Sequence, residues 1–131
     1  MNELLGLSLT DLCGKIHAKE VSPVELMEAV LGRIDEANGD LNAVVSMRDR
    51  EELLSDARAS EERVANGDAR PLEGIPLGVK DLEDVGGMVT SMGSRPFAED
   101  VASQDSDQVA LLRKAGAIVV GKTNTPEFGY T

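Results

Sequence analysis

Residues 111–121 have the sequence LLRKAGAIVVG, which is the clearest indication of the fold class. Val109 and Leu112 recur at helical spacing, and Gly116 is placed to end the helix that they predict. The next four residues, 117–120, form a continuous apolar run, which is typical of a strand buried on both faces. A helix that leads directly into such a strand predicts an α/β layer.

The same region, residues 116–123, matches the pattern G-x-x-x-x-G-K-T of a phosphate-binding P-loop. Three of its four spacer residues are β-branched, which favours an extended strand over a tight loop of amides around phosphate. A P-loop also follows a strand and opens a long helix, whereas here a helix precedes Gly116 and Pro126 lies just beyond Thr123. Nucleotide binding therefore remains the lesser alternative for this segment.

Upstream, residues 71–97 contain glycines at positions 74, 78, 86, 87 and 93 and short runs in which apolar residues alternate. This pattern predicts strand and loop rather than helix. Lys80 ends the alternating run, and Gly78 lets backbone or substrate approach closely beside it. On spacing alone, Lys80 is most simply a surface lysine that pairs with Asp81 or Asp84.

The alternative is that Lys80 acts as a catalytic base. An amine accepts a proton near neutral pH only when burial lowers its pKa, so this function requires a lysine sheltered from water. Asp81 follows Lys80 directly and would point to the opposite face of a strand, so its carboxylate need not hold the ammonium group. Asp84 is the remaining competitor for an ion pair.

The amino-terminal half reads as helical over about residues 8–66. Ser8 caps a short first helix, and Ser22-Pro23-Val24-Glu25 predicts the start of a second that ends at Asn38-Gly39. A brief strand over residues 43–45 precedes a third helix, over residues 50–66, which Gly67 closes.

Composition excludes several classes of ligand. The chain of 131 residues carries 24 acidic and 13 basic side chains, and a net charge of −11 repels phosphate backbones and anionic lipid. Cys13 is the only cysteine and His17 the only histidine, so the sequence predicts neither a disulfide nor a zinc site. Cys13 is expected in the core and His17 at the surface. No bound cofactor is expected, no apolar run reaches membrane-spanning length, and a reducing cytoplasm fits best.

Several segments, taken in order, resemble the amidase signature family. They are PLEGIPLGVKD at 71–81, TSMGS at 90–94, LLRKAGA at 111–117 and GKTNTPEFG at 121–129, with SPVEL at 22–26 and LNA at 41–43 upstream. The resemblance covers nearly the whole chain. One departure is Leu82, which stands where many family members carry Asn, and it affects the loop after Lys80.

The resemblance implies an amide hydrolase that uses a serine nucleophile, a second serine in a cis peptide and a lysine base. Lys80 occupies the position of that lysine, and Lys122 would be a structural part of the Gly-Lys-Thr-Asn turn. Both serines would belong to a Gly/Ser-rich segment beyond Thr131, so the chain alone is expected to be inactive. Residues expected to shape the site are Gly78, Ser91, Ser94, Thr123 and Asn124.

The expected fold is thus an incomplete α/β domain over residues 1–131, in which helices pack on part of a mixed sheet. Its parts are a helical region at about 8–66, a strand and loop region at about 71–97 and a helix and strand at 105–121. Unpaired strand edges favour self-association or a complementing chain. The alternative is a binding or scaffold module with no chemistry. The small-molecule substrate stays open among aryl and aliphatic amides, short peptides, nylon-type oligomers and the glutamine of a tRNA-linked amidotransferase.

Overall fold

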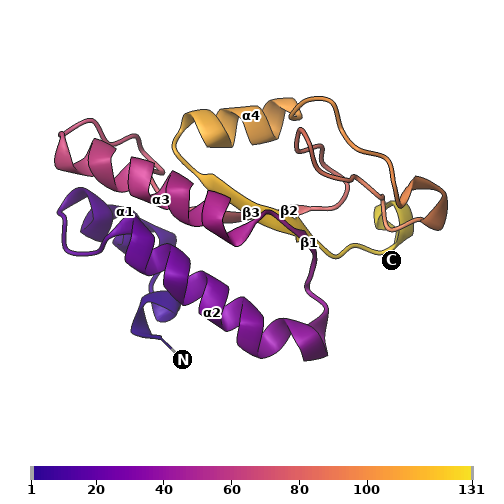
Figure 1. Cartoon of the computed structure of the whole chain (residues 1–131), viewed down its shortest axis with the longest axis horizontal. Coiled ribbons are helices and arrows are strands. Elements are labelled where there is room, and N and C mark those ends of the chain that lie inside the picture. The colour runs from indigo at the N-terminus through magenta and orange to yellow at the C-terminus, as the bar shows by residue number, and fades with distance from the viewer. Residues whose placement is uncertain (1, 131) are drawn as a thin grey trace.

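The computed structural model describes residues 2–130, in which helices flank a small mixed sheet (Figure 1). In chain order the elements are η1 (Glu3–Gly6), α1 (Leu9–His17), α2 (Pro23–Leu41), β1 (Val44–Met47), α3 (Arg50–Ala65), β2 (Pro76–Lys80), η2 (Arg95–Phe97), α4 (Asp107–Lys114), β3 (Ile118–Thr123) and η3 (Glu127–Gly129). The mixed α/β class expected from the sequence is confirmed. No described helix is both long enough and apolar enough to cross a bilayer.

The helix starts follow the predicted capping residues. The Ser8 hydroxyl accepts a hydrogen bond from the backbone N–H of Asp11, and the Ser22 hydroxyl accepts from those of Val24 and Glu25. The predicted end of α2 at Asn38-Gly39 is wrong. The helix continues to Leu41 because Asn42, at φ 48°, takes the left-handed conformation that ends it.

The sheet has the strand order β1-β3-β2, with β3 in the centre. β1 pairs with β3 in the antiparallel sense, and β2 pairs with β3 in the parallel sense. All four residues of the predicted apolar run, Ala117 to Val120, are buried, so a strand buried on both faces is confirmed. The strand continues to Thr123, which corrects the prediction of a turn at Gly-Lys-Thr-Asn.

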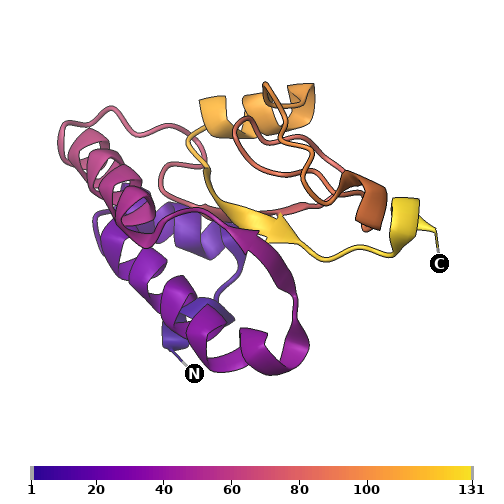
Figure 2. The same cartoon turned by 45° about the vertical axis from the view of Figure 1, so that its right-hand side comes forward.

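Different helices cover the two faces of the sheet, as Figures 1 and 2 show. On one face, Ile118 and Val120 pack against Met27 and Leu31 of α2 and against α3. On the other face, neighbouring side chains of β2 and β3 pack with α4 and the loop that follows β2: Val79, Val119, Val85 and Val109. The alternation of side chains along a strand therefore decides which environment each residue of β2 and β3 enters.

Candidate functional site

Lys80 is the last residue of β2 and pairs in register with Thr123 at the end of β3. The preceding residue, Val79, is buried in the core under α4, so Lys80 projects from the opposite face of the sheet. There its side chain is exposed, and no ion pair joins it to another residue within 2–130. The expectation that Lys80 is sheltered from water is not met by this chain alone.

Gly78 and Thr123 lie on the same face of the sheet as Lys80. A Cβ atom at Gly78 would come 2.8 Å from Cγ2 of Thr123, so the two residues are in close contact across the parallel pair. Both also line an apolar cavity of about 190 Å³ between α2 and the sheet, together with Val30 and Ile34 of α2. Two of the predicted site-shaping residues are thereby brought next to the lysine.

Asp81 turns away from Lys80 and enters a buried polar cluster. Its carboxylate accepts a hydrogen bond from Nζ of Lys122 at 3.1 Å, and both side chains are almost completely removed from water. The same ammonium group donates to the carbonyl oxygen of Val89 and to Oγ1 of Thr90, each at 3.1 Å. Three acceptors thus match the three N–H groups of Lys122.

Ser91 contacts Asp81 rather than Lys80. Its backbone N–H donates to Oδ1 of Asp81 at 3.1 Å, and its hydroxyl donates to Oδ2. The backbone of Asp81 is held as well, because its N–H donates to the carbonyl oxygen of Thr123 and its own carbonyl accepts from Met92. Asp81 therefore ties the loop after β2 to the end of β3, directly beside Lys80.

Ser94 and Asn124 are not brought to Lys80 either. The Ser94 hydroxyl donates to Oε1 of Glu127 at 2.9 Å, and the side-chain amide of Asn124 donates to the carbonyl oxygen of Asn42 at 3.0 Å. The two residues anchor the carboxyl-terminal segment to the loop before η2 and to the end of α2. Their hydrogen bonds support the backbone around the site, and neither side chain hydrogen-bonds to Lys80 among residues 2–130.

The sequence patterns did not predict that Lys122 and Thr90 would belong to this buried cluster. One pattern could have predicted the burial of Lys122. Residues 117–120 form a strand that is buried on both faces, so the next inward-facing side chain of the same strand also enters the core. Lys122 is fully buried and pairs with Asp81, which also removes the basis for the P-loop alternative. A lysine in that position cannot reach a phosphate group, and its segment is strand rather than loop.

Cys13 and His17 lie on α1, far in sequence from this cluster. Burial raises the pKa of the Cys13 thiol, and the side chain packs at the edge of the core formed by α1 and α2. His17 is exposed, with Nδ1 2.7 Å from the carbonyl oxygen of Cys13. No cluster of three or more potential metal ligands occurs in the part of the chain that the structure describes.

Comparison with known proteins identifies a family. The Amidase family model matches residues 25–131. The chain is 42% identical to a glutamyl-tRNA(Gln) amidotransferase subunit of Aromatoleum aromaticum and 39% identical to an acylamidase of Rhodococcus erythropolis. Each match covers 95% of this chain, and 25% and 26% of the respective relatives.

Solved structures agree with the sequence matches. The native peptide amidase of Stenotrophomonas maltophilia superimposes with a TM-score of 0.83 at 33% identity, over 92% of this chain and 25% of that one. The chain therefore spans about a quarter of the length of these relatives. It belongs to the Amidase family.

Proposed function

We propose that this chain supplies the general-base lysine, Lys80, of an amide hydrolase of the amidase signature type. The observation that carries the proposal is the separation of Lys80 from Asp81. Lys122 pairs with the neighbouring carboxylate on the opposite face of the sheet, so Asp81 forms no ion pair with Lys80. Lys80 is thereby left without an ion pair among residues 2–130, at the open end of two parallel strands.

In the proposed reaction, the lysine draws a proton through the hydroxyl of the cis-peptide serine from the serine nucleophile. The nucleophile attacks the amide carbonyl, and fixed backbone amides stabilise the oxyanion that develops. Lys80 then returns the proton to the leaving amine. Both serines and the oxyanion loop come from protein outside this sequence, and that same protein must cover Lys80 and exclude water, because a solvated amine remains protonated at neutral pH.

Because the proposed reaction needs serines that this chain does not supply, we expect the isolated chain to be inactive. The serines nearest to Lys80 in sequence are committed to other contacts, Ser91 to Asp81 and Ser94 to Glu127. A purified 131-residue chain should therefore show no amide turnover above the uncatalysed rate. Turnover at an ordinary enzymatic rate would contradict the missing-nucleophile part of the proposal.

The open sheet favours a complementing segment or a second copy of the chain. β1 is an edge strand, and Val45 and Met47 are 42% and 39% exposed. Such an edge offers unpaired backbone groups and apolar surface to another chain. Size-exclusion chromatography should show self-association of the isolated chain, whereas a clean monomer across a wide concentration range would count against this.

The proposed substrate is a small-molecule amide, because the names of the relatives refer to amides. The proposed location is the cytoplasm. The negative net charge disfavours direct binding to nucleic acid or to an anionic membrane surface. The apolar cavity beside Gly78 and Thr123 lies on the face where the reacting carbonyl would approach Lys80. No cofactor takes part in this mechanism.

The test is a chimera in which this chain replaces the matched quarter of the Stenotrophomonas maltophilia peptide amidase. Substitution Lys80→Ala in the chimera should lower kcat by roughly 10²–10⁴-fold, the usual contribution of a positioned acid–base group. The matched control is Lys114→Ala, which removes an exposed lysine from α4 and should leave activity unchanged.

The same chimera distinguishes a catalytic part from a scaffold without chemistry. If Lys80→Ala retains full activity while the thermal unfolding midpoint also stays unchanged, the chain contributes only structure. Sequencing the gene downstream of Thr131 adds an independent check, because a Gly/Ser-rich continuation would place the nucleophile in the same polypeptide.

A further inference from the structure

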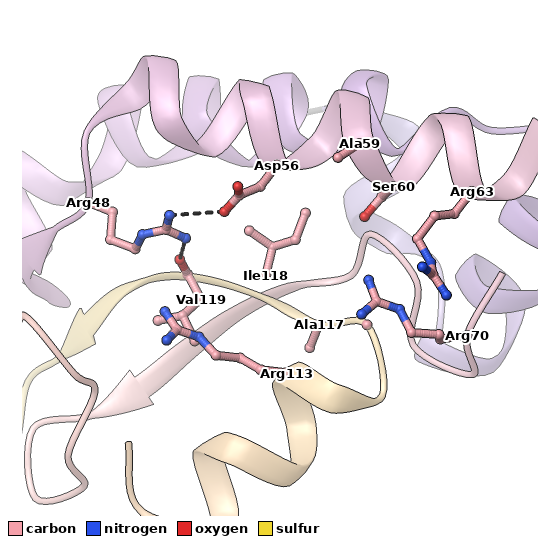
Figure 3. Close-up of a pocket in the computed structure, with 11 residues that line it drawn as sticks. Arg48, Asp56, Ala59, Ser60, Arg63, Arg70, Arg113, Ala117, Ile118 and Val119 are labelled. Atoms are coloured by element: carbon pink, nitrogen blue, oxygen red, sulfur yellow. Dashed lines mark hydrogen bonds and ion pairs between the residues drawn. The ribbon is translucent and has the colours of Figure 1, made fainter. Parts of the chain in front are cut away.

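Four of the eight arginines in this acidic chain line one cavity of about 360 Å³. They are Arg48, Arg63, Arg70 and Arg113. The cavity lies between α3 and the start of β3 (Figure 3). Lys80 lies at the opposite end of the parallel strands. Asp56 is the single carboxylate residue among the described residues that line it.

The arginines come from four different parts of the fold. Arg48 follows β1, Arg63 lies on α3, Arg70 lies in the loop after α3, and Arg113 lies near the end of α4. Figure 3 shows Arg48 and Arg113 at one end of the cavity and Arg63 and Arg70 at the other. Between the two pairs, the floor is apolar and consists of Ala117 and Ile118.

At one end, a single buried carboxylate serves two arginines. Glu73 accepts from Nε of Arg63 at 2.9 Å, and from Nε and Nη2 of Arg70 at 2.8 Å each. It also accepts from the Ser60 hydroxyl at 2.7 Å and from the backbone N–H of Arg70 at 3.3 Å. One negative charge thus faces two positive charges, and the other partner of Arg63, Asp68, is largely exposed and screened by water.

At the other end, two arginines are held without using all of their donors. Nη1 of Arg48 donates to the carbonyl oxygen of Val119 at 3.1 Å, and Nη2 donates to Asp56 at 2.9 Å. Arg113 uses Nη1 alone to bind both oxygens of Asp105, at 3.0 and 3.1 Å. These contacts hold the guanidinium groups in place before any ligand arrives, which lowers the entropy lost on binding.

Unused donors remain at both ends. Within residues 2–130, no side-chain or backbone acceptor contacts Nη1 of Arg70 or the Nε and Nη2 groups of Arg113. No buried side-chain nitrogen among the described residues lacks a partner, so these free donors face water. Guanidinium groups with free N–H groups bind carboxylate and phosphate oxygens through paired hydrogen bonds.

We propose that this cavity is a binding site for a small organic anion that presents carboxylate or phosphoryl oxygens to the arginines at its two ends. The apolar floor between the pairs accommodates a short aliphatic body. Among carboxylates, the arrangement predicts that a dicarboxylate binds more tightly than a monocarboxylate.

The proposal is tested by titrating the purified chain with glutarate, with acetate and with inorganic phosphate at low ionic strength. Calorimetry gives the dissociation constants, and backbone amide resonances of Ala117, Ile118 and Val119 report whether the ligand enters the cavity. We expect saturable binding of glutarate or phosphate with Kd of about 1 mM or tighter. Binding should weaken steeply as sodium chloride is raised.

Two variants with the same change in charge supply the matched control. Arg113→Gln removes a cavity arginine, and Arg58→Gln removes an exposed arginine of α3 that does not line the cavity. Arg113→Gln should weaken binding about tenfold or more, since a charged hydrogen-bonded pair is lost. Arg58→Gln should leave the dissociation constant unchanged.

The outcomes separate the two ligand chemistries. Tighter binding of glutarate than of phosphate and acetate assigns the cavity to a dicarboxylate, and tighter binding of phosphate assigns it to a phosphoryl group. Equal weakening by Arg113→Gln and Arg58→Gln, or the absence of saturation and of shifts at residues 117–119, would overturn the proposal. The resonance shifts of the unsubstituted chain decide the question even if Arg113→Gln does not fold.

Discussion

Lys80 and Lys122 stand near the carboxyl ends of two neighbouring parallel strands, yet their environments are opposite. Lys80 is exposed and lies on the face with Gly78 and Thr123. Lys122 is fully buried and bound to Asp81, Thr90 and the carbonyl oxygen of Val89. The two lysines differ because they lie on opposite faces of the sheet. Lys122 is in register with the buried Val79, and Lys80 is in register with the partly buried Thr123.

The contrast shows how a fold can place a carboxylate beside a lysine in sequence and still keep the two charges apart. Asp81 is adjacent to Lys80, but its charge is balanced within the core by Lys122. A buried ion pair of this kind contributes little net stability, although the loss of one partner is costly. Lys122 is therefore bound within the core, whereas Lys80, the lysine of the proposed reaction, stays exposed and without an ion pair among residues 2–130.

The largest effect is expected for Lys122→Met. The substitution leaves the carboxylate of Asp81 buried without its cation, and we expect a loss of about 3–5 kcal/mol in the free energy of unfolding. Urea denaturation followed by circular dichroism measures it. Adding Asp81→Asn to Lys122→Met should recover part of the loss, because the uncompensated charge is then gone. A single variant as stable as the unsubstituted chain would show that Lys122 does not balance a buried charge.

The next largest effect is expected when a methyl group is added at Gly121, directly before Lys122, or at Gly78, two residues before Lys80. A Cβ atom at Gly121 would overlap the carbonyl oxygen of Ser46, which belongs to the backbone of β1 and cannot move without breaking the β1–β3 pairing. Gly121→Ala should therefore cost about 1–3 kcal/mol. At Gly78 the nearest atom is a side-chain methyl group of Thr123, so Gly78→Ala should cost less. Thermal unfolding of the two variants tests this order, and equal midpoints would contradict it.

A second buried carboxylate, Glu73, gives the stability of the chain a dependence on pH. Burial favours the protonated form of this group, but the hydrogen bonds from Arg70 and Ser60 and the charge of Arg70 outweigh it, so the pKa of Glu73 lies below its ordinary value of 4.5. A depressed pKa contributes stability that is fully present above the unfolded value and is lost as the pH falls through the folded value.

Glu73→Gln should accordingly destabilise the chain most at neutral pH, and the difference from the unsubstituted chain should shrink as the pH falls below about 4.5. Urea midpoints measured for both proteins from neutral pH downward give the difference curve. A difference that is independent of pH would mean that the Glu73 carboxylate is not stabilised by its arginines.

The smallest effect is expected at Lys80 itself. Lys80→Met removes an exposed ammonium group with no ion pair among the described residues, so the free energy of unfolding should change by no more than about 0.5 kcal/mol. The measurement is the same urea titration used for Lys122→Met. A large loss at Lys80 would show that this lysine also supports the fold and would remove the contrast.

Local patterns predicted most of the secondary structure. The caps at Ser8 and Ser22, the helical stop at Gly116 and the apolar run of residues 117–120 each act over a few residues, and the structure confirms them. The end of α2 was predicted wrongly because Asn38-Gly39 is a stronger local helix stop than Asn42. In the structure, the helix ends at Asn42 instead. In addition, Asn38 binds the backbone of Val44 through its side chain, and this contact depends on where β1 lies.

The candidate site could be predicted only in part. The ordered motifs single out Lys80, Gly78 and Thr123, and parallel pairing brings these three together. Ser91 was expected near Lys80 and instead contacts Asp81, because the loop after β2 returns across the face that carries Lys122. The path of that loop depends on contacts between residues about 10 to 41 positions apart in the chain, which no local pattern contains.

The α/β class, the family resemblance and the candidate lysine follow from the amino-acid sequence alone, because helix caps, apolar periodicity and ordered motifs are properties of short segments. The three-dimensional fold was needed to learn which lysine is buried, which partner balances Asp81 and that four arginines meet around one cavity. These outcomes depend on strand register and on the face that each side chain enters. A shift of one residue in register would exchange the two faces and with them the environments of Lys80 and Lys122.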